Sequence, residues 1–149
     1  MQLLSRRSML GIAAVVDIAH HARPTPVAAK ALAARHALPP RHLETLLQAL
    51  VRHGILKGVR GPRGGYELAR ERRRITAGDI VRAAMTAAVP EDEPAPSSRL
   101  VDQVVSPAVN RASGAFLAEL DEITVEDLCR DAEGKLVFGG TPVGIDFAI

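Results

Sequence analysis

The sequence predicts a mainly α-helical fold with one small β-hairpin, a winged helix-turn-helix followed by a long helix (α+β class). In residues 41–54 Leu recurs at spacings of three and four and the segment ends in a glycine, which indicates an amphipathic helix and its C-terminus. Residues 55–68 hold two short apolar runs around a Gly-rich, basic tip, which predicts a hairpin. Residues 106–121 predict the long helix. A helix followed by a basic-tipped hairpin is typical of winged helices, where the helix suits the major groove.

Charge is divided unevenly between the two halves of the 149-residue chain. Residues 1–74 hold 14 Lys/Arg against 4 Asp/Glu, whereas residues 75–149 hold 5 against 13, although the net charge is only +2. The basic N-terminal half favours a polyanion as its partner, and the acidic C-terminal half is expected to lie away from that polyanion. No apolar run is long enough to span a membrane, and Asp17 interrupts the apolar stretch 8–19, so we expect neither a membrane segment nor a secretory signal.

The first helix is expected over residues 5–22. Ser5 is its predicted N-cap, and Ile12, Val15, Val16 and Ala19 form its buried stripe. Arg6 and Arg7 stand in the first turn, where positive charge opposes the helix dipole and a phosphate would compensate it. Solvated arginines are the alternative.

The second and third helices form the helix-turn-helix. Helix two is expected over about 27–36, the turn over 36–39, and helix three from Pro40, where a missing N–H costs nothing. The N-terminal and outward face of helix three is the part that meets base edges. Its candidate DNA-binding residues are Arg41, His42, Glu44, Thr45 and Gln48.

The candidate residues of the hairpin lie at its tip. Arg60, Gly61, Pro62 and Arg63 are placed to contact the DNA backbone or a minor groove, where arginine is favoured by the enhanced negative potential. After the hairpin, Thr76 with Asp79 resembles a capping box that opens a helix reaching about Ala87. Residues 90–98 are acidic and Pro-rich and predict a loop.

The long helix is expected to begin at Ser106–Pro107 and to end near Asp121. An alternative is a start at Ser98 with a kink at Pro107. Small and apolar residues form a stripe along it: Ala108, Ala112, Ala115, Phe116 and Leu120. Thr124 then caps a short helix. The tail, residues 132–149, has strand-like KLVF and GIDFAI segments around a Gly-Gly-Thr-Pro turn, which predicts a hairpin or a partner-binding segment.

The segment HLETLLQALVRHGILKGVRGPRGGYELAR resembles the IscR/NsrR/CymR group of bacterial transcription regulators, the Rrf-two (Rrf2) family. The resemblance covers most of residues 3–86 and resumes at 120–128. It implies that Glu44 reads bases, that the wing tip contacts DNA, and that the long helix pairs two subunits into a homodimer through its stripe. A two-fold dimer would read two half-sites. Arg41 and His42 depart from the residues common in the family, so a different operator is expected.

The resemblance implies that many relatives hold an iron–sulfur cluster through three cysteines in the loop before the long helix. Here residues 87–106 contain neither Cys nor His, and Cys129 is the only cysteine of the chain. We therefore expect no cluster, no metal and no cofactor. The interpretation favoured for Cys129 is a buried small side chain in a reducing cytosol, with a reactive thiol as the alternative.

The sequence therefore predicts a cytoplasmic bacterial protein that binds double-stranded DNA as a homodimeric regulator, with repression favoured over activation. The alternative is a winged-helix interaction module controlled by a protein or small-molecule effector. An enzyme is not expected, because no nucleophile–base set or phosphate loop is present. The expected division is 1–88 for the DNA-binding domain, 89–105 for the loop, 106–131 for the dimerisation and short helices, and 132–149 for the tail.

Overall fold

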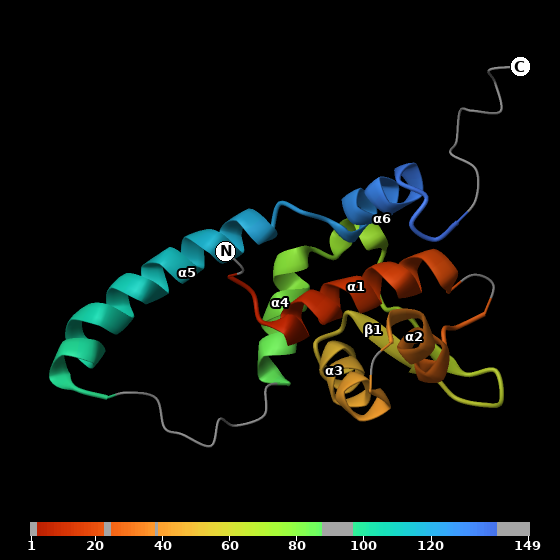
Figure 1. Cartoon of the computed structure of the whole chain (residues 1–149), viewed down its shortest axis with the longest axis horizontal. Helices are drawn as coiled ribbons and strands as arrows, with labels where there is room; N and C mark the ends of the chain where they lie inside the picture. The colour runs from red at the N-terminus through yellow and green to blue at the C-terminus, as the bar shows by residue number, and fades with distance from the viewer. Residues whose placement is uncertain (1–2, 23–24, 38, 88–96, 140–149) are drawn as a thin grey trace, which may run out of the picture.

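The computed structural model describes residues 3–22, 25–37, 39–87 and 97–139. Two parts are visible in Figure 1: a body that contains α1 to α4, the hairpin and α6, and an arm that projects from it. The arm is defined here as residues 99–120. The elements of the body are α1 (Arg6–His21), α2 (Ala29–His36), α3 (Pro40–Arg52), β1 (Leu56–Val59), β2 (Gly65–Leu68), the short 3₁₀ helix Arg72–Arg74, α4 (Ala77–Thr86) and α6 (Val125–Gly134).

Helix α1 lies at the centre of the body and packs against α2, α3, α4 and α6. Ser5 caps it as predicted, because its side chain accepts a hydrogen bond from the Ser8 N–H. Val15 and Ile18 are fully buried in the main core. Asp17, between them, is also fully buried, which the sequence pattern did not predict.

The helix-turn-helix has the expected order with one shift at its start. Helix α2 begins at Ala29 rather than Val27, because the backbone of Val27 pairs with that of Tyr66 in the hairpin. Ala37 takes a left-handed conformation (φ 51°) in the turn, and Pro40 stands at the first position of α3 as predicted. Gly54, with φ 72°, follows the end of α3.

The hairpin is a two-stranded antiparallel sheet in which Leu56 pairs with Leu68 and Val59 pairs with Gly65. Leu56 points into the core, whereas the rest of β1 is exposed. The mainly helical fold with a small hairpin is therefore confirmed.

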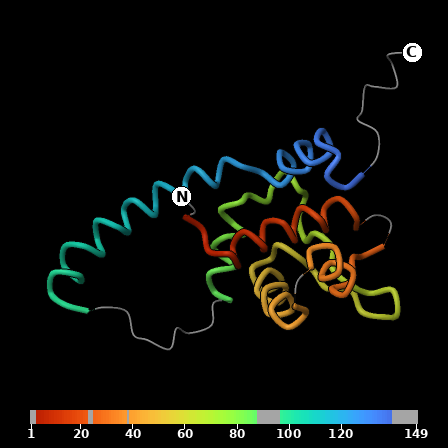
Figure 2. The backbone as a smooth tube through the Cα atoms, viewed as in Figure 1, coloured from red at the N-terminus to blue at the C-terminus, as the bar shows by residue number. Residues whose placement is uncertain are grey.

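Two predicted capping boxes open α4 and α6. The Thr76 side chain accepts from the Asp79 N–H, and the Thr124 side chain accepts from the Asp127 N–H. In each box the aspartate carboxylate accepts in turn from the backbone N–H of the threonine. The two N-termini are joined by an isolated bridge between Thr76 and Thr124. As a result α6 packs on α1 (Figure 2). Its Val125 and Cys129 belong to the main core rather than to the arm. This placement differs from the sequence-based grouping of α6 with the long helix.

The arm begins at Arg99 and not at Ser106, which agrees with the alternative start near Ser98. Its first part contains a π-helical turn, Val101–Val105, which leads into α5 (Ser106–Leu120). Pro107 explains the wider turn, because a proline within a helix lacks an N–H and its ring clashes with the carbonyl four residues earlier. The Ser106 N–H instead bonds to the carbonyl of Val101.

The predicted strand in KLVF is wrong. Lys135–Phe138 form turns after α6, and Phe138 stacks on His20 with ring centroids 4.4 Å apart. This segment therefore contacts α1 through Phe138 and does not pair as a strand. The GIDFAI segment and the acidic loop at 88–96 lie outside the described residues. Within the described ranges no helix is long and apolar enough to cross a membrane.

Candidate nucleic-acid interface

Helix α3 separates its side chains onto two faces. Leu43, Leu46, Leu47, Ala49 and Leu50 are buried in the body. The other face is exposed, and it carries all five predicted residues: Arg41, His42, Glu44, Thr45 and Gln48. This face therefore offers cationic, amide, hydroxyl and carboxylate groups to a ligand without any need to open the core.

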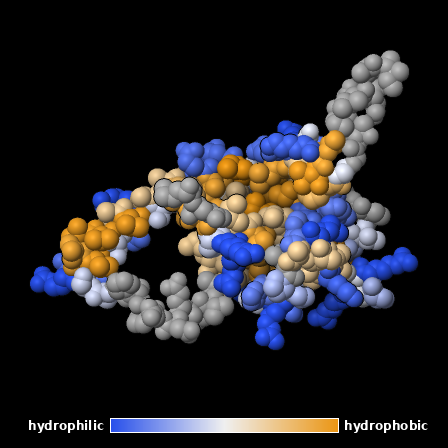
Figure 3. Space-filling model, in the orientation of Figure 1, coloured by the Kyte–Doolittle hydropathy of each residue, from blue (hydrophilic) through white to orange (hydrophobic). Residues whose placement is uncertain are grey.

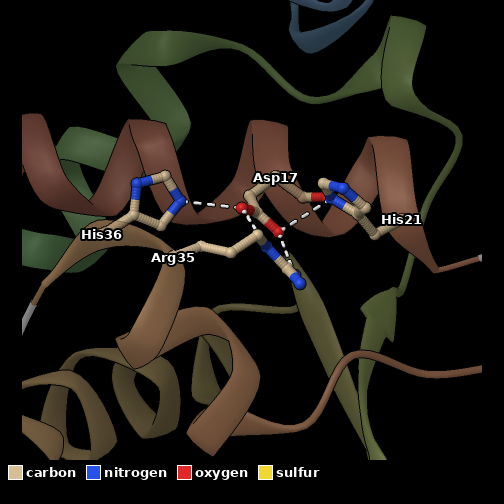
Figure 4. Close-up of polar contacts among 4 residues, drawn as sticks. All are labelled: Asp17, His21, Arg35 and His36. Carbon is tan, nitrogen blue, oxygen red and sulfur yellow. Dashed lines mark hydrogen bonds and ion pairs between the residues drawn. The ribbon is translucent and has the colours of Figure 1, made fainter. Parts of the chain in front are cut away.

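A buried carboxylate connects α1 to α2, the helix that precedes α3 (Figure 4). Arg35 donates from Nη2 to Oδ1 of Asp17 at 2.6 Å and from Nε to Oδ2 at 2.9 Å. His36 Nε2 lies 2.7 Å from Oδ2, and His21 Nδ1 lies 3.1 Å from Oδ1. Both oxygens of Asp17 are therefore satisfied, and the C-terminal end of α2 is held against α1.

Burial raises the pKa of Asp17, but hydrogen bonds from Arg35 and His36 and the charges of Arg35 and His21 lower it. The net result is a pKa below the ordinary value of an aspartate. This carboxylate is therefore ionised wherever the fold is intact near neutral pH. The sequence contained no local signal for this contact, because Arg35 lies 18 residues from Asp17.

The wing tip is a tight turn in which the Gly64 N–H bonds to the Gly61 carbonyl at 2.9 Å. A Cβ at Gly64 would lie 2.2 Å from the Val59 carbonyl oxygen, so only glycine fits there. Gly61 has a φ of 114°, which also favours glycine. The turn exposes all four predicted tip residues, Arg60, Gly61, Pro62 and Arg63.

The arginines of the body fall into two groups. Arg70, Arg72 and Arg73 lie within 4 Å of Asp79, Glu126 and Glu71, respectively. In contrast, within the described residues no ion pair involves Arg41, Arg60 or Arg63. A guanidinium that has no internal carboxylate partner is available to a phosphate, so α3 and the wing tip each carry positive charge that an anion could bind.

Arg7 is half-buried at the start of α1 and borders a hollow of about 400 Å³. The N-terminal part of α3 forms the other side of this hollow through His42 and Leu43. The structure thus brings Arg7 close to the exposed face of α3, although the two lie far apart in the sequence.

Tyr66 was missed as a candidate. It borders a hollow of about 590 Å³ with Lys30 of α2 and Glu44 of α3. It also borders a second hollow with Gln48 and Arg52. The available signal was an aromatic residue directly after the wing glycines, which places a ring between the helix and the hairpin.

The predicted dimerisation stripe divides into two parts. Ala108, Ala112 and Ala115 are exposed, as a contact surface requires. Leu120 is buried and Phe116 is half-buried, because both pack against Ala77 and Val81 of α4 in the same chain. These two side chains therefore anchor the arm to its own body instead of extending the exposed stripe.

Donor groups for a metal are not gathered in the described part of the chain, where no three His, Cys, Asp or Glu side chains form a ligand set. Cys129 is 1% exposed. Burial raises the pKa of its thiol, while the nearby Arg72 lowers it to a smaller extent.

Comparison with known proteins gives a consistent result. Residues 4–131 match the model of the family described as "Rrf2: Iron-dependent Transcriptional regulator". The chain is 34% identical to Protein rrf2 of Nitratidesulfovibrio vulgaris over 87% of its own length and 88% of that protein. It is 29% identical to the HTH-type transcriptional regulator CymR of Bacillus subtilis over 89% and 93% of the two chains. Among solved structures, T. potens IscR matches with a TM-score of 0.68 and 33% identity over 90% of each chain.

Proposed function

Because this chain belongs to the Rrf2 family of DNA-binding transcription regulators, we propose that it acts as a homodimeric repressor. It reads operator bases with α3 and holds the flanking DNA with the wing tip. The observation that carries this proposal is the exposed polar face of α3 together with the exposed wing-tip arginines, for which the described residues contain no ion-pair partner. We place this activity in the cytoplasm, where the DNA lies.

Two kinds of DNA contact have different roles, one for affinity and one for base preference. Arg60 and Arg63 neutralise phosphates or enter the minor groove, which gives affinity that falls steeply with salt. Glu44 accepts a hydrogen bond from a cytosine amino group, and Arg41 donates to a guanine, which gives base preference. A carboxylate near DNA is repelled unless it finds such a donor, so Glu44 selects bases more than it adds affinity.

The arm supplies the contact between two copies. Its outer part carries four exposed apolar side chains, Leu100, Val104, Val105 and Val109, which are 43–64% exposed. Figure 3 shows this end of the arm as a hydrophobic surface that stands clear of the body. Pairing with a second copy would bury it, and the resulting two-fold symmetry would present two reading helices to a palindromic site.

An iron–sulfur cluster does not fit the donors that this chain has. Four ligands, commonly thiolates, hold such clusters. The single thiol, Cys129, is buried in the main core, and residues 87–106 contain no Cys or His. We therefore derive no regulatory step from iron.

The test of DNA reading is selection of bound genomic fragments with the purified protein at two salt concentrations. We expect a palindromic motif with half-sites about one helical turn apart. Glu44→Ala should relax the base preference, whereas Arg60→Ala should weaken binding to all sequences and reduce the salt dependence. Lys135→Ala, which removes an exposed charge paired with Asp131 on α6, is the matched control. Weak, sequence-blind binding would contradict the proposal and favour control through a protein or small-molecule partner.

The test of pairing is sedimentation of a Val104→Asp variant. A charge within a buried apolar contact should shift the protein toward monomers, whereas Gln103→Asp places the same charge at an exposed polar neighbour and should leave dimers intact. Equal sedimentation of the two variants would refute the arm as the dimer contact.

A further inference from the structure

The base of the arm is attached to α4 by two different kinds of contact. Leu120 packs on Ala77 and Val81, and Phe116 and Leu117 join the same cluster. One residue further, Arg82 of α4 forms a bidentate pair with Asp121, with Nη1–Oδ1 at 2.6 Å and Nη2–Oδ2 at 2.9 Å. Apolar contacts are not directional, whereas two parallel N–H···O bonds fix both distance and orientation.

Gly78 is the third part of this attachment. A Cβ at Gly78 would lie 1.9 Å from Oδ1 of Asp121 and 3.0 Å from Nη1 of Arg82. The absence of a side chain therefore allows the carboxylate to lie directly on α4. Beyond Asp121 the chain is held by the Ala77 N–H, which donates to the Ile123 carbonyl at 2.8 Å.

We propose that Arg82 and Asp121 are positioning residues that set the direction of the arm and thereby the spacing between half-sites that the dimer accepts. This inference rests on the proposed homodimer. The pair is partly exposed, with side chains 46% and 38% accessible, so its contribution to stability is small. Its role is to determine the angle at which the arm leaves the body.

The length of the arm amplifies any change at its base. A helix that spans residues 99–120 is about 30 Å long. A rotation of about 6–7° at the base therefore moves the far end by about 3.4 Å, which is one base-pair step along DNA. Each added base pair also turns the groove by about 35°. A dimer that accepts an altered spacing must therefore change the direction of its arms as well as the position of their ends, which the fixed orientation of the Arg82–Asp121 pair opposes.

The experiment measures affinity for three DNA duplexes: the palindrome recovered by selection with the wild-type protein, and versions with one base pair removed or added between the half-sites. The variants are Asp121→Asn and Arg82→Lys, which change the pair conservatively, and Gly78→Ala, which displaces it. Asp131→Asn is the matched control, because Asp131 forms an exposed ion pair on α6 far from the arm base. Sedimentation at the same protein concentration establishes the state of each variant.

We expect the wild-type protein and the control to bind the correct spacing at least tenfold more tightly than the altered ones. In the Asp121→Asn, Arg82→Lys and Gly78→Ala dimers this preference should fall below about threefold, mainly because the altered duplexes bind better. Dimeric variants that keep the wild-type preference would overturn the inference while leaving the homodimer in place. A wild-type protein that sediments as a monomer would instead refute the homodimer, and the inference with it.

Discussion

Replacement of Asp17 by Asn tests the buried contact between α1 and α2. The change keeps the shape of the side chain but removes its charge and turns one acceptor into a donor. The amide N–H₂ would then face either Arg35 or the His36 ring, both of which lie within 3 Å of the present carboxylate. We expect the helix-turn-helix to lose its attachment to α1 before the rest of the body is affected.

The size of this effect follows from burial. Asp17 is fully buried, and removal of one partner from a buried ion pair typically costs about 3–5 kcal/mol. The partners are less enclosed, since the side chains of Arg35, His21 and His36 are 27–35% exposed and recover part of their hydration. We therefore expect Asp17→Asn to lower the free energy of unfolding by about 2–3 kcal/mol, after a discount for this screening.

Urea unfolding, followed by circular dichroism at one protein concentration, measures this difference. Asp131→Asn is the control: Asp131 is 61% exposed and pairs with Lys135 directly after α6, so the change should lower the free energy of unfolding by less than about 0.5 kcal/mol. If Asp17→Asn destabilises the protein no more than this control, the contact does not hold the two helices.

The same contact has a pH signature. Because the folded pKa of Asp17 lies below the unfolded value, its stabilisation is present above about pH 4 and is lost as the pH falls through the folded pKa. The stability difference between the wild-type protein and Asp17→Asn should therefore shrink as the pH is lowered from about 5 toward 3. If the stability difference grew on acidification, the pKa of Asp17 would be raised on folding rather than lowered.

Three smaller experiments, two substitutions and one labelling measurement, test the C-terminal part of the body. Thr124→Ala removes the α6 cap, so the free energy of unfolding should fall by about 1 kcal/mol in urea, and no loss would mean that the Asp127 side of the box is sufficient. Cys129 should react with iodoacetamide only as fast as the protein opens, because burial keeps its thiol protonated and enclosed; labelling as fast as in the unfolded chain would contradict this. Phe138→Ala should lower the free energy of unfolding by about 1–2 kcal/mol, which is less than the loss of a fully buried Phe, because Phe138 is half-buried. An unchanged urea midpoint would show that the stacking of Phe138 on His20 does not stabilise the protein.

Local signals in the sequence correctly predicted those features in which the interacting residues lie within one turn of a helix. Ser5, Thr76 and Thr124 cap the helices that they were expected to open, and Gly54 follows the end of α3. The polar face of α3 follows from its period of 3.6, because the buried Leu positions leave the others exposed. The tip of the wing was equally readable from its glycines.

The sequence by itself thus determined the order of the elements, the winged helix-turn-helix and the residues on the exposed polar face of α3. The tertiary structure decided which distant groups meet: Asp17 with Arg35, Phe138 with His20, and Arg82 with Asp121. It also placed α6 on α1 and Leu120 in the body rather than in the exposed stripe. The physical reason is that capping and periodicity depend on neighbours a few residues apart, whereas an ion pair or an apolar contact depends on where the packed helices bring side chains that lie far apart in the chain.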